Sequence, residues 1–255
     1  MEFFSPKGSI VRKIWSNADT ILFVFAGASA EFALNKAVDW LYFTGRLPAD
    51  PLGRLFSTVT YARMIVFSEL DKANKAIDQI TAIHSEVEVN RGSKIPDWAY
   101  RDVLFLLIDY SVRAFELLNR KLTSAEKEEV YHTFYRVGLR MNLKDLPASY
   151  QQWLPVREGH MRGDLEKSRF TVDLYKQYKK HLGLARFILL KEVQAQLVPR
   201  HVRQLLGLRK VSLLMLIVPL YKLSRKLKLD GLAKALILPS AYQQQIKALD
   251  QVVGK

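Results

Sequence analysis

The chain has 255 residues, of which 49% are hydrophobic and 25% charged, which is typical of a globular protein with a buried core and excludes a disordered chain. It contains no cysteine, so disulfides, thiolate metal sites and cysteine nucleophiles are excluded. The formal net charge of +14 favours a polyanionic partner, either nucleic acid or an anionic membrane surface.

Apolar residues recur at helical spacing along almost the whole chain, and no alternating strand pattern of useful length interrupts them. The sequence therefore predicts an all-α protein of about eight to eleven helices, in one large domain over residues 1–255. The expected helical segments, in chain order, are 17–45, 51–69, 71–89, 98–119, 123–141, 146–154, 167–182, 183–197 and 199–208, followed by C-terminal helices.

Local signals mark the ends of several expected helices. The stretch ILFVFAGASA in the first segment is apolar on all sides, which predicts a centrally buried helix with a break near Gly27 and a stop at Gly45. Three later helix starts carry capping or first-turn signals, namely Asp97 as a cap, Thr123 with Glu126 at capping-box spacing, and Pro147 in a first turn.

One histidine lies on the apolar face of the helix expected at 71–89. Ile77, Ile80, His84 and Val87 follow one another at spacings of three and four, which places them on one side of the helix. An inward histidine is most often a core residue that bonds a carbonyl or carboxylate. The alternative is a metal or haem ligand, because a single imidazole can hold haem iron with the other face open to oxygen.

The preceding helix supplies polar residues that a haem would need. Arg54 and Thr58 are four residues apart and share a face, so they could serve the propionates and the distal side of a haem, or reach water instead. Motifs for nucleotide-binding loops, zinc sites, serine hydrolases and di-iron bundles are absent, and no two histidines stand four apart. Neither a helix-turn-helix nor an aromatic RNA-binding motif is present, so nucleic acid is not the expected partner.

The C-terminal region is both basic and apolar. Residues 199–228 contain eight lysines and arginines and no acid, and they enclose the apolar run VSLLMLIVPLY. This run is shorter than the ~20 residues that cross a bilayer, and Pro219 interrupts it. It can be a helix in the headgroup region of an anionic membrane, or a buried terminal helix with solvated lysines. Because the N-terminus also lacks a signal-peptide layout, we expect a cytoplasmic protein, free or peripheral at a membrane.

Two segments resemble one known family. Residues 50–87 (DPLGRLFSTVTYARMIVFSELDKANKAIDQITAIHSEV) and 122–153 (LTSAEKEEVYHTFYRVGLRMNLKDLPASYQQW) are similar to the MpaB-type oxygenases and the rubber oxygenase (latex clearing protein) catalytic domain. The similarity covers roughly residues 20–210, and the second segment carries the more specific pattern. It implies globin-like helical packing around haem b, with His84 as the proximal iron ligand and with Arg54 and Thr58 in or near the haem pocket.

The same resemblance implies oxidative chemistry on an apolar substrate. Characterised members cleave carbon–carbon double bonds of isoprenoid chains with dioxygen, some of them at an internal membrane. The expected partners are therefore O2, an apolar isoprenoid-like substrate and an anionic membrane surface. The carboxylate that acts as a base near the haem has two candidates here, Glu31 and Asp39.

The sequence departs from the family pattern at three places. Ser57 stands where the rubber-cleaving branch has a lysine that caps the distal iron face. Leu34-Asn35 replaces a His-Pro pair, and an apolar residue near Leu104 replaces a histidine. Two functional hypotheses follow: a haem-dependent oxygenase, or a helical lipid-binding or membrane-surface protein without redox activity.

Overall fold

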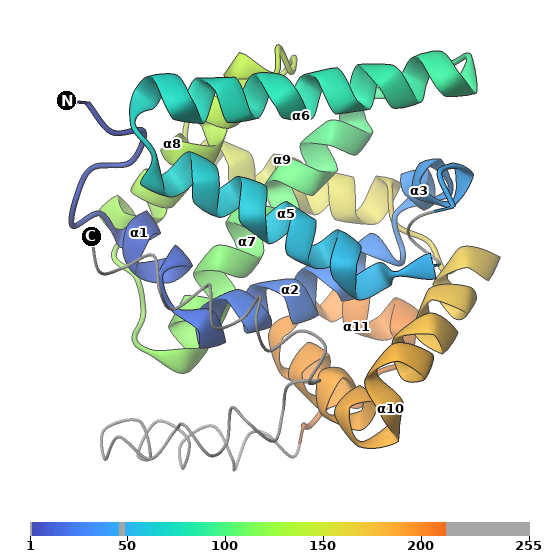
Figure 1. Ribbon diagram of the computed structural model, residues 1–255. Coiled ribbons are helices and arrows are strands. Elements are labelled where there is room, and N and C mark those ends of the chain that lie inside the picture. The colour runs from blue at the N-terminus through green and yellow to red at the C-terminus, as the bar shows by residue number, and fades with distance from the viewer. Residues whose placement is uncertain (1, 46–48, 213–255) are drawn as a thin grey trace.

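The computed structural model describes residues 2–45 and 49–212. Within these ranges the chain is all-α: the only β pairing there consists of two isolated bridges, Phe3–Glu69 and Asn35–Leu165. The helices, labelled as in Figure 1, are α1 (Ile10–Trp15), α2 (Ala18–Phe32), the 3-10 helix η1 (Lys36–Val38), α3 (Asp39–Phe43), α5 (Pro51–Phe67), α6 (Leu70–Arg91), α7 (Asp97–Leu118), α8 (Ser124–Arg140), α9 (Tyr150–Gly163), α10 (Arg169–Leu197) and α11 (Arg200–Leu206).

Helix α2 runs through the middle of the molecule, as its apolar sequence predicts. It packs against α1, α5, α7, α10 and α11, and its most extensive contact is with α7 (Figure 1). The expected break near Gly27 is wrong, because α2 continues to Phe32. Gly27 instead lets the two helices approach closely: a Cβ at this position would lie 2.2 Å from Cδ1 of Tyr110 on α7.

Other predicted helix ends are confirmed or corrected by the structure. Thr123 and Glu126 form the expected capping box at the start of α8. Asp97 is the first residue of α7 and Pro96 holds the cap position, so Asp97 is a first-turn acid that favours the helix dipole. Pro147 lies before α9, whose cap is Ser149, because the Ser149 hydroxyl accepts from the backbone NH of Gln152.

Helices α5 and α6 form an antiparallel pair joined by a short connection. Asp50 caps α5 by accepting the backbone NH of Gly53 at 2.8 Å, and α6 ends at Gly92, whose φ of 70° suits glycine. Because the two helices run in opposite directions, the first turns of α5 and the last turns of α6 lie at the same end of the pair, although the helices diverge toward that end in Figure 1. Arg54, in the first turn of α5, is near enough to His84 to lower the pKa of its ring.

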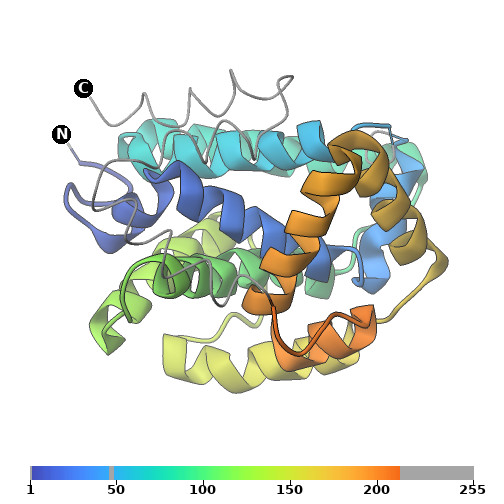
Figure 2. The same ribbon diagram turned by 90° about the horizontal axis from the view of Figure 1, so that it is seen from below.

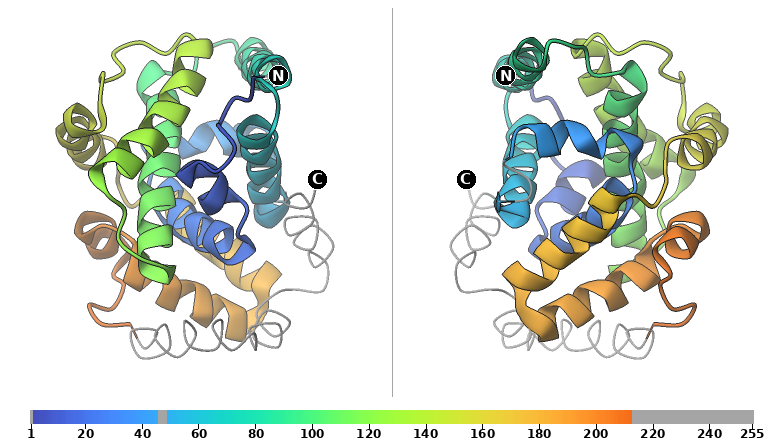
Figure 3. Two further views of the ribbon diagram at one scale, coloured as in Figure 1. Left: turned by 90° about the vertical axis from the view of Figure 1, so that its left-hand side faces the viewer. Right: turned by 90° about the vertical axis from the view of Figure 1, so that its right-hand side faces the viewer.

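Helix α10 is bent into two arms. Gly183 has φ 73° and ψ 168°, which is outside the helical region, and the bend is visible in Figures 2 and 3. The division expected between 182 and 183 is therefore confirmed. The arm that ends at Leu197 leads into α11, which packs beside α9 (Figure 2).

None of the helices in the described ranges is long and apolar enough to cross a membrane. Most of the basic and apolar C-terminal region, from residue 213 onward, lies outside the described residues. The expectation that this region contacts a membrane surface therefore stays a prediction from sequence.

Candidate functional site

His84 lies near the C-terminal end of α6 and is partly buried. Its Nδ1 atom is buried and has no hydrogen-bond partner among the described residues. Burial, and after it the positive charge of Arg54, lower the pKa of the ring to about 4, and Glu88 opposes this shift. The imidazole is therefore neutral at physiological pH and keeps a nitrogen lone pair for a ligand.

The surroundings of His84 come from three helices. Its ring packs against that of Tyr100 on α7, with centroids 5.1 Å apart. Glu88, one turn further along α6, accepts hydrogen bonds from the Tyr100 hydroxyl at 3.0 Å and from the backbone NH of Ile95 at 2.9 Å. The third helix is α5, where Arg54 is partly buried. The apolar face predicted for α6 is confirmed at its core end, where Ile77 is buried.

The other residues predicted for this site are placed as follows. Thr58 is partly buried one turn beyond Arg54, and its hydroxyl is 3.4 Å from the backbone carbonyl of Arg54. Ser57, which replaces a lysine of the rubber-cleaving branch, is also partly buried. Leu104 is 5% exposed and belongs to the main hydrophobic core. The structure thus brings Arg54 close enough to His84 to affect its charge, whereas Leu104 packs among core residues.

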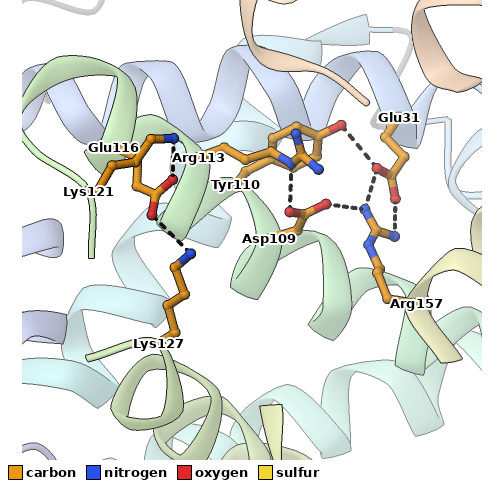
Figure 4. A network of polar contacts seen from close by, with 8 residues as sticks. All are labelled: Glu31, Asp109, Tyr110, Arg113, Glu116, Lys121, Lys127 and Arg157. Carbon is orange, nitrogen blue, oxygen red and sulfur yellow. Dashed lines mark hydrogen bonds and ion pairs between the residues drawn. The ribbon is translucent and has the colours of Figure 1, made fainter. Parts of the chain in front are cut away.

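Glu31, the first candidate base, is 1% exposed and belongs to a buried ion-pair network (Figure 4). Arg157 of α9 holds both of its carboxylate oxygens, with Nη1–Oε1 at 2.6 Å and Nη2–Oε2 at 2.5 Å. The Tyr110 hydroxyl donates to Oε2 at 3.0 Å. Arg157 also contacts Asp109 at 3.3 Å, and Asp109 pairs with Arg113 at 2.6 Å.

This network fixes the charge state of its members. Burial by itself lowers the pKa of Arg157, but the charges of Glu31 and Asp109 outweigh burial and raise it overall. The pKa of Tyr110 is raised well above its usual value by burial and by the charge of Glu31. Arg157 therefore stays charged and Tyr110 stays neutral, and the network ties α2, α7 and α9 together.

Asp39, the second candidate base, is the first residue of α3. It pairs with Arg91 at the end of α6, at 2.7 Å, and the Arg91 guanidinium stacks 3.9 Å from the centroid of the Trp40 ring. This contact ties α3 to the C-terminal end of α6, seven residues beyond His84.

A second cluster of polar residues, which the sequence reasoning missed, lies where α7 meets the end of α9. His160 Nδ1 is 2.7 Å from Asp102 Oδ1 and 3.1 Å from Asp164 Oδ2. The other Asp102 oxygen accepts from the Asn35 side chain at 2.7 Å. Asp102, His160 and Asp164 each offer one ligand atom within 4.8 Å of the others, so they could hold a metal ion. The sequence signal was the spacing of four between His160 and Asp164 on one helix.

A pocket of about 710 Å³ lies between α7, α9 and α11. Arg157 and Asp109 of the ion-pair network are among its lining residues, but Arg54, Thr58 and His84 are not. The pocket and the surroundings of His84 are therefore two distinct sites.

Fold and site together define an all-α protein with a neutral, partly buried histidine on α6 that has neighbours on α5 and α7. The family model described as "ER-bound oxygenase mpaB/B'/Rubber oxygenase, catalytic domain" matches residues 15–220. The chain belongs to this family and is an oxygenase-type catalytic domain, which confirms the resemblance seen in the sequence. Neither a curated protein nor a solved structure matches the chain.

Proposed function

We propose that the protein is a haem-b-dependent oxygenase that uses O2 to oxygenate or cleave an apolar, isoprenoid-like substrate, with His84 as the iron ligand. The observation that carries the proposal is the buried Nδ1 of His84, which lacks a hydrogen-bond partner among the described residues. Buried polar atoms are rarely left unpaired in native proteins, so an unpaired one calls for an explanation. A bound metal is one such explanation, and the neutral state of the ring suits it.

The side chains around His84 would supply several of the groups that a haem needs. A bound haem would supply iron for the activation of dioxygen. Arg54 would pair with a propionate, and its positive charge adds to burial in lowering the pKa of the imidazole. Thr58, one turn further along α5, would place a hydroxyl beside the bound group, and the ring of Tyr100 would hold the imidazole in position.

Glu31 would take part in proton transfer only under a specific condition. Both of its oxygens are held by Arg157, and one of them also accepts from Tyr110. To accept a proton from substrate, the carboxylate would have to give up at least one of these bonds. The proposed role of Glu31 as a base therefore requires the side chain of Arg157 or Tyr110 to move away from it.

The test is an absorption spectrum of purified protein reconstituted with haemin. We expect a Soret band that His84→Ala removes and that added imidazole restores, because the free ligand can replace the missing side chain. The matched control is His132→Ala, since His132 is exposed on α8 and lies outside the site. A spectrum without a Soret band in the reconstituted wild type, or one that is unchanged in His84→Ala, would refute the proposal.

We also propose that residues 1–255 form one domain, peripheral to an anionic membrane. The domain proposal is supported by the main hydrophobic core, which contains residues from Phe4 to Val202. Calorimetry should show a single transition with equal calorimetric and van't Hoff enthalpies, whereas two separate transitions would oppose it. The membrane proposal rests on the basic sequence of residues 199–228.

Flotation with anionic liposomes tests the membrane proposal. Replacement of Lys222, Arg225, Lys226 and Lys228 by glutamine should reduce flotation, because fewer charges face the anionic lipid. The control is the same number of replacements among exposed lysines of α10. Equal flotation of wild type and the C-terminal variant would contradict the proposal.

A further inference from the structure

The pocket between α7, α9 and α11 has a cationic lining. Its charged residues are four arginines and two acids: Arg113, Arg157, Arg162, Arg200, Asp109 and Glu158. Arg113 pairs with Asp109, and Arg162 pairs with Glu158. Arg200 is exposed and has no ion-pair partner in the described part of the chain. Arg157 is paired with Glu31, so the excess positive charge of the pocket comes from Arg200.

Two buried polar atoms belong to residues that line this pocket. Arg157 is 3% exposed and uses its terminal nitrogens on Glu31 and Asp109, but its Nε has no partner within the described ranges. His201 also lines the pocket, and its Nε2 is buried and likewise unpaired among the residues described. An unpaired buried polar atom is unfavourable, but both atoms are closed off from solvent, so the donors that the open pocket offers to a ligand are those of the exposed Arg162 and Arg200.

Apart from Gln204, the rest of the lining is apolar. Trp153 is almost fully buried, Leu154 is 41% exposed, and Pro155, Met161 and Pro199 complete this part. An aromatic ring beside aliphatic side chains suits the hydrocarbon part of a ligand, not a bare inorganic ion. The pocket thus combines a cationic, donor-rich part with an apolar part.

We propose that this pocket binds an amphipathic organic anion. Its oxyanion, a carboxylate or phosphoryl group, would pair with the arginines, and its apolar body would pack against Trp153 and Leu154. Arginine is suited to such groups because its planar donors bind two oxygens at once. Ligand binding here does not depend on haem at His84, because none of the residues named around His84 lines the pocket.

Isothermal titration calorimetry tests the site in the full-length protein with dodecyl phosphate as the probe, kept below its micelle concentration. Dodecyl phosphate should bind more tightly than either inorganic phosphate or neutral dodecanol, since each of these lacks one half of the ligand. Arg200→Gln should weaken binding about tenfold through the loss of one charge-assisted contact. The matched control is Arg209→Gln, which removes the same charge from an exposed residue outside the pocket.

Vesicles that contain phosphatidic acid identify the source of the anion. Vesicle binding that is weakened by Arg200→Gln would identify a lipid headgroup, whereas binding of the monomeric probe alone would identify a free metabolite. The proposal is overturned if dodecyl phosphate does not bind, if dodecanol binds equally well, or if Arg209→Gln weakens binding as much as Arg200→Gln. A circular dichroism spectrum of each variant confirms that folding is unchanged.

Discussion

Removal of His84 should change how the stability of the protein depends on pH. In the folded apo-protein the pKa of His84 is about 4, against an ordinary value of 6.5. Between these two values the unfolded chain binds a proton at His84 and the folded chain does not. The contribution of this residue to stability is therefore fully present above pH 6.5 and is lost as the pH falls toward 4.

The magnitude follows from the difference between the two pKa values. A gap of about 2.5 pH units, at about 1.4 kcal/mol per unit, corresponds to ~3 kcal/mol over the whole range. Between about pH 7 and about pH 4.5, the free energy of unfolding should fall by most of this amount, ~2 kcal/mol, because of His84. His84→Gln removes the titrating group, so the variant should lose ~2 kcal/mol less than wild type over that interval.

Urea unfolding of the apo-protein at the two pH values measures this difference. Other histidines and the carboxylates titrate in both proteins, so their contributions cancel when the two are compared. His132→Gln provides a control. Because His132 is exposed, the stability of this variant should depend on pH as that of the wild type does. If His84→Gln and wild type lose the same free energy of unfolding within ~0.5 kcal/mol, the reasoning on burial and Arg54 is refuted.

Two further predictions concern the helix packing that supports the site. Glu31→Gln should lower the free energy of unfolding by ~3–5 kcal/mol, since it leaves the buried Arg157 charge only partly compensated; a loss below ~1 kcal/mol would show that the pair is not desolvated. Gly27→Ala should destabilise by at least ~1–3 kcal/mol, because the added methyl group would overlap the Tyr110 ring. Gly159→Ala, in an open position on α9, serves as the control and should be neutral or stabilising by up to ~1 kcal/mol; equal losses in both variants would contradict the overlap argument.

The elements of this protein are encoded locally to a large extent. Helical periodicity predicts the all-α class and the division of α10 at Gly183, and the spacing of Thr123 and Glu126 predicts the capping box of α8. Family membership also follows from short contiguous segments and is confirmed by the match over residues 15–220. Periodicity, caps and motifs depend on residues that are close in sequence, and for that reason they can be read without a structure.

Several local signals were nonetheless misleading, because the tertiary context overrode them. Glycine in a helix is usually a weak point, yet Gly27 sits inside a continuous helix since Tyr110 of α7 occupies the space of its missing side chain. Pro147 matched a first helical turn, but the Ser149 hydroxyl offered a better cap two residues later.

The sequence by itself determined the all-α class, the family and the place of His84 on an apolar helix face. Only the tertiary structure decided that Arg54 approaches His84, that Arg157 holds Glu31, and that Asp102 meets His160 and Asp164. These pairs are separated by 30 to 126 residues, apart from the local pair His160 and Asp164. The charge and reactivity of such groups depend on burial and on partners from other helices, which become defined only once the helices pack.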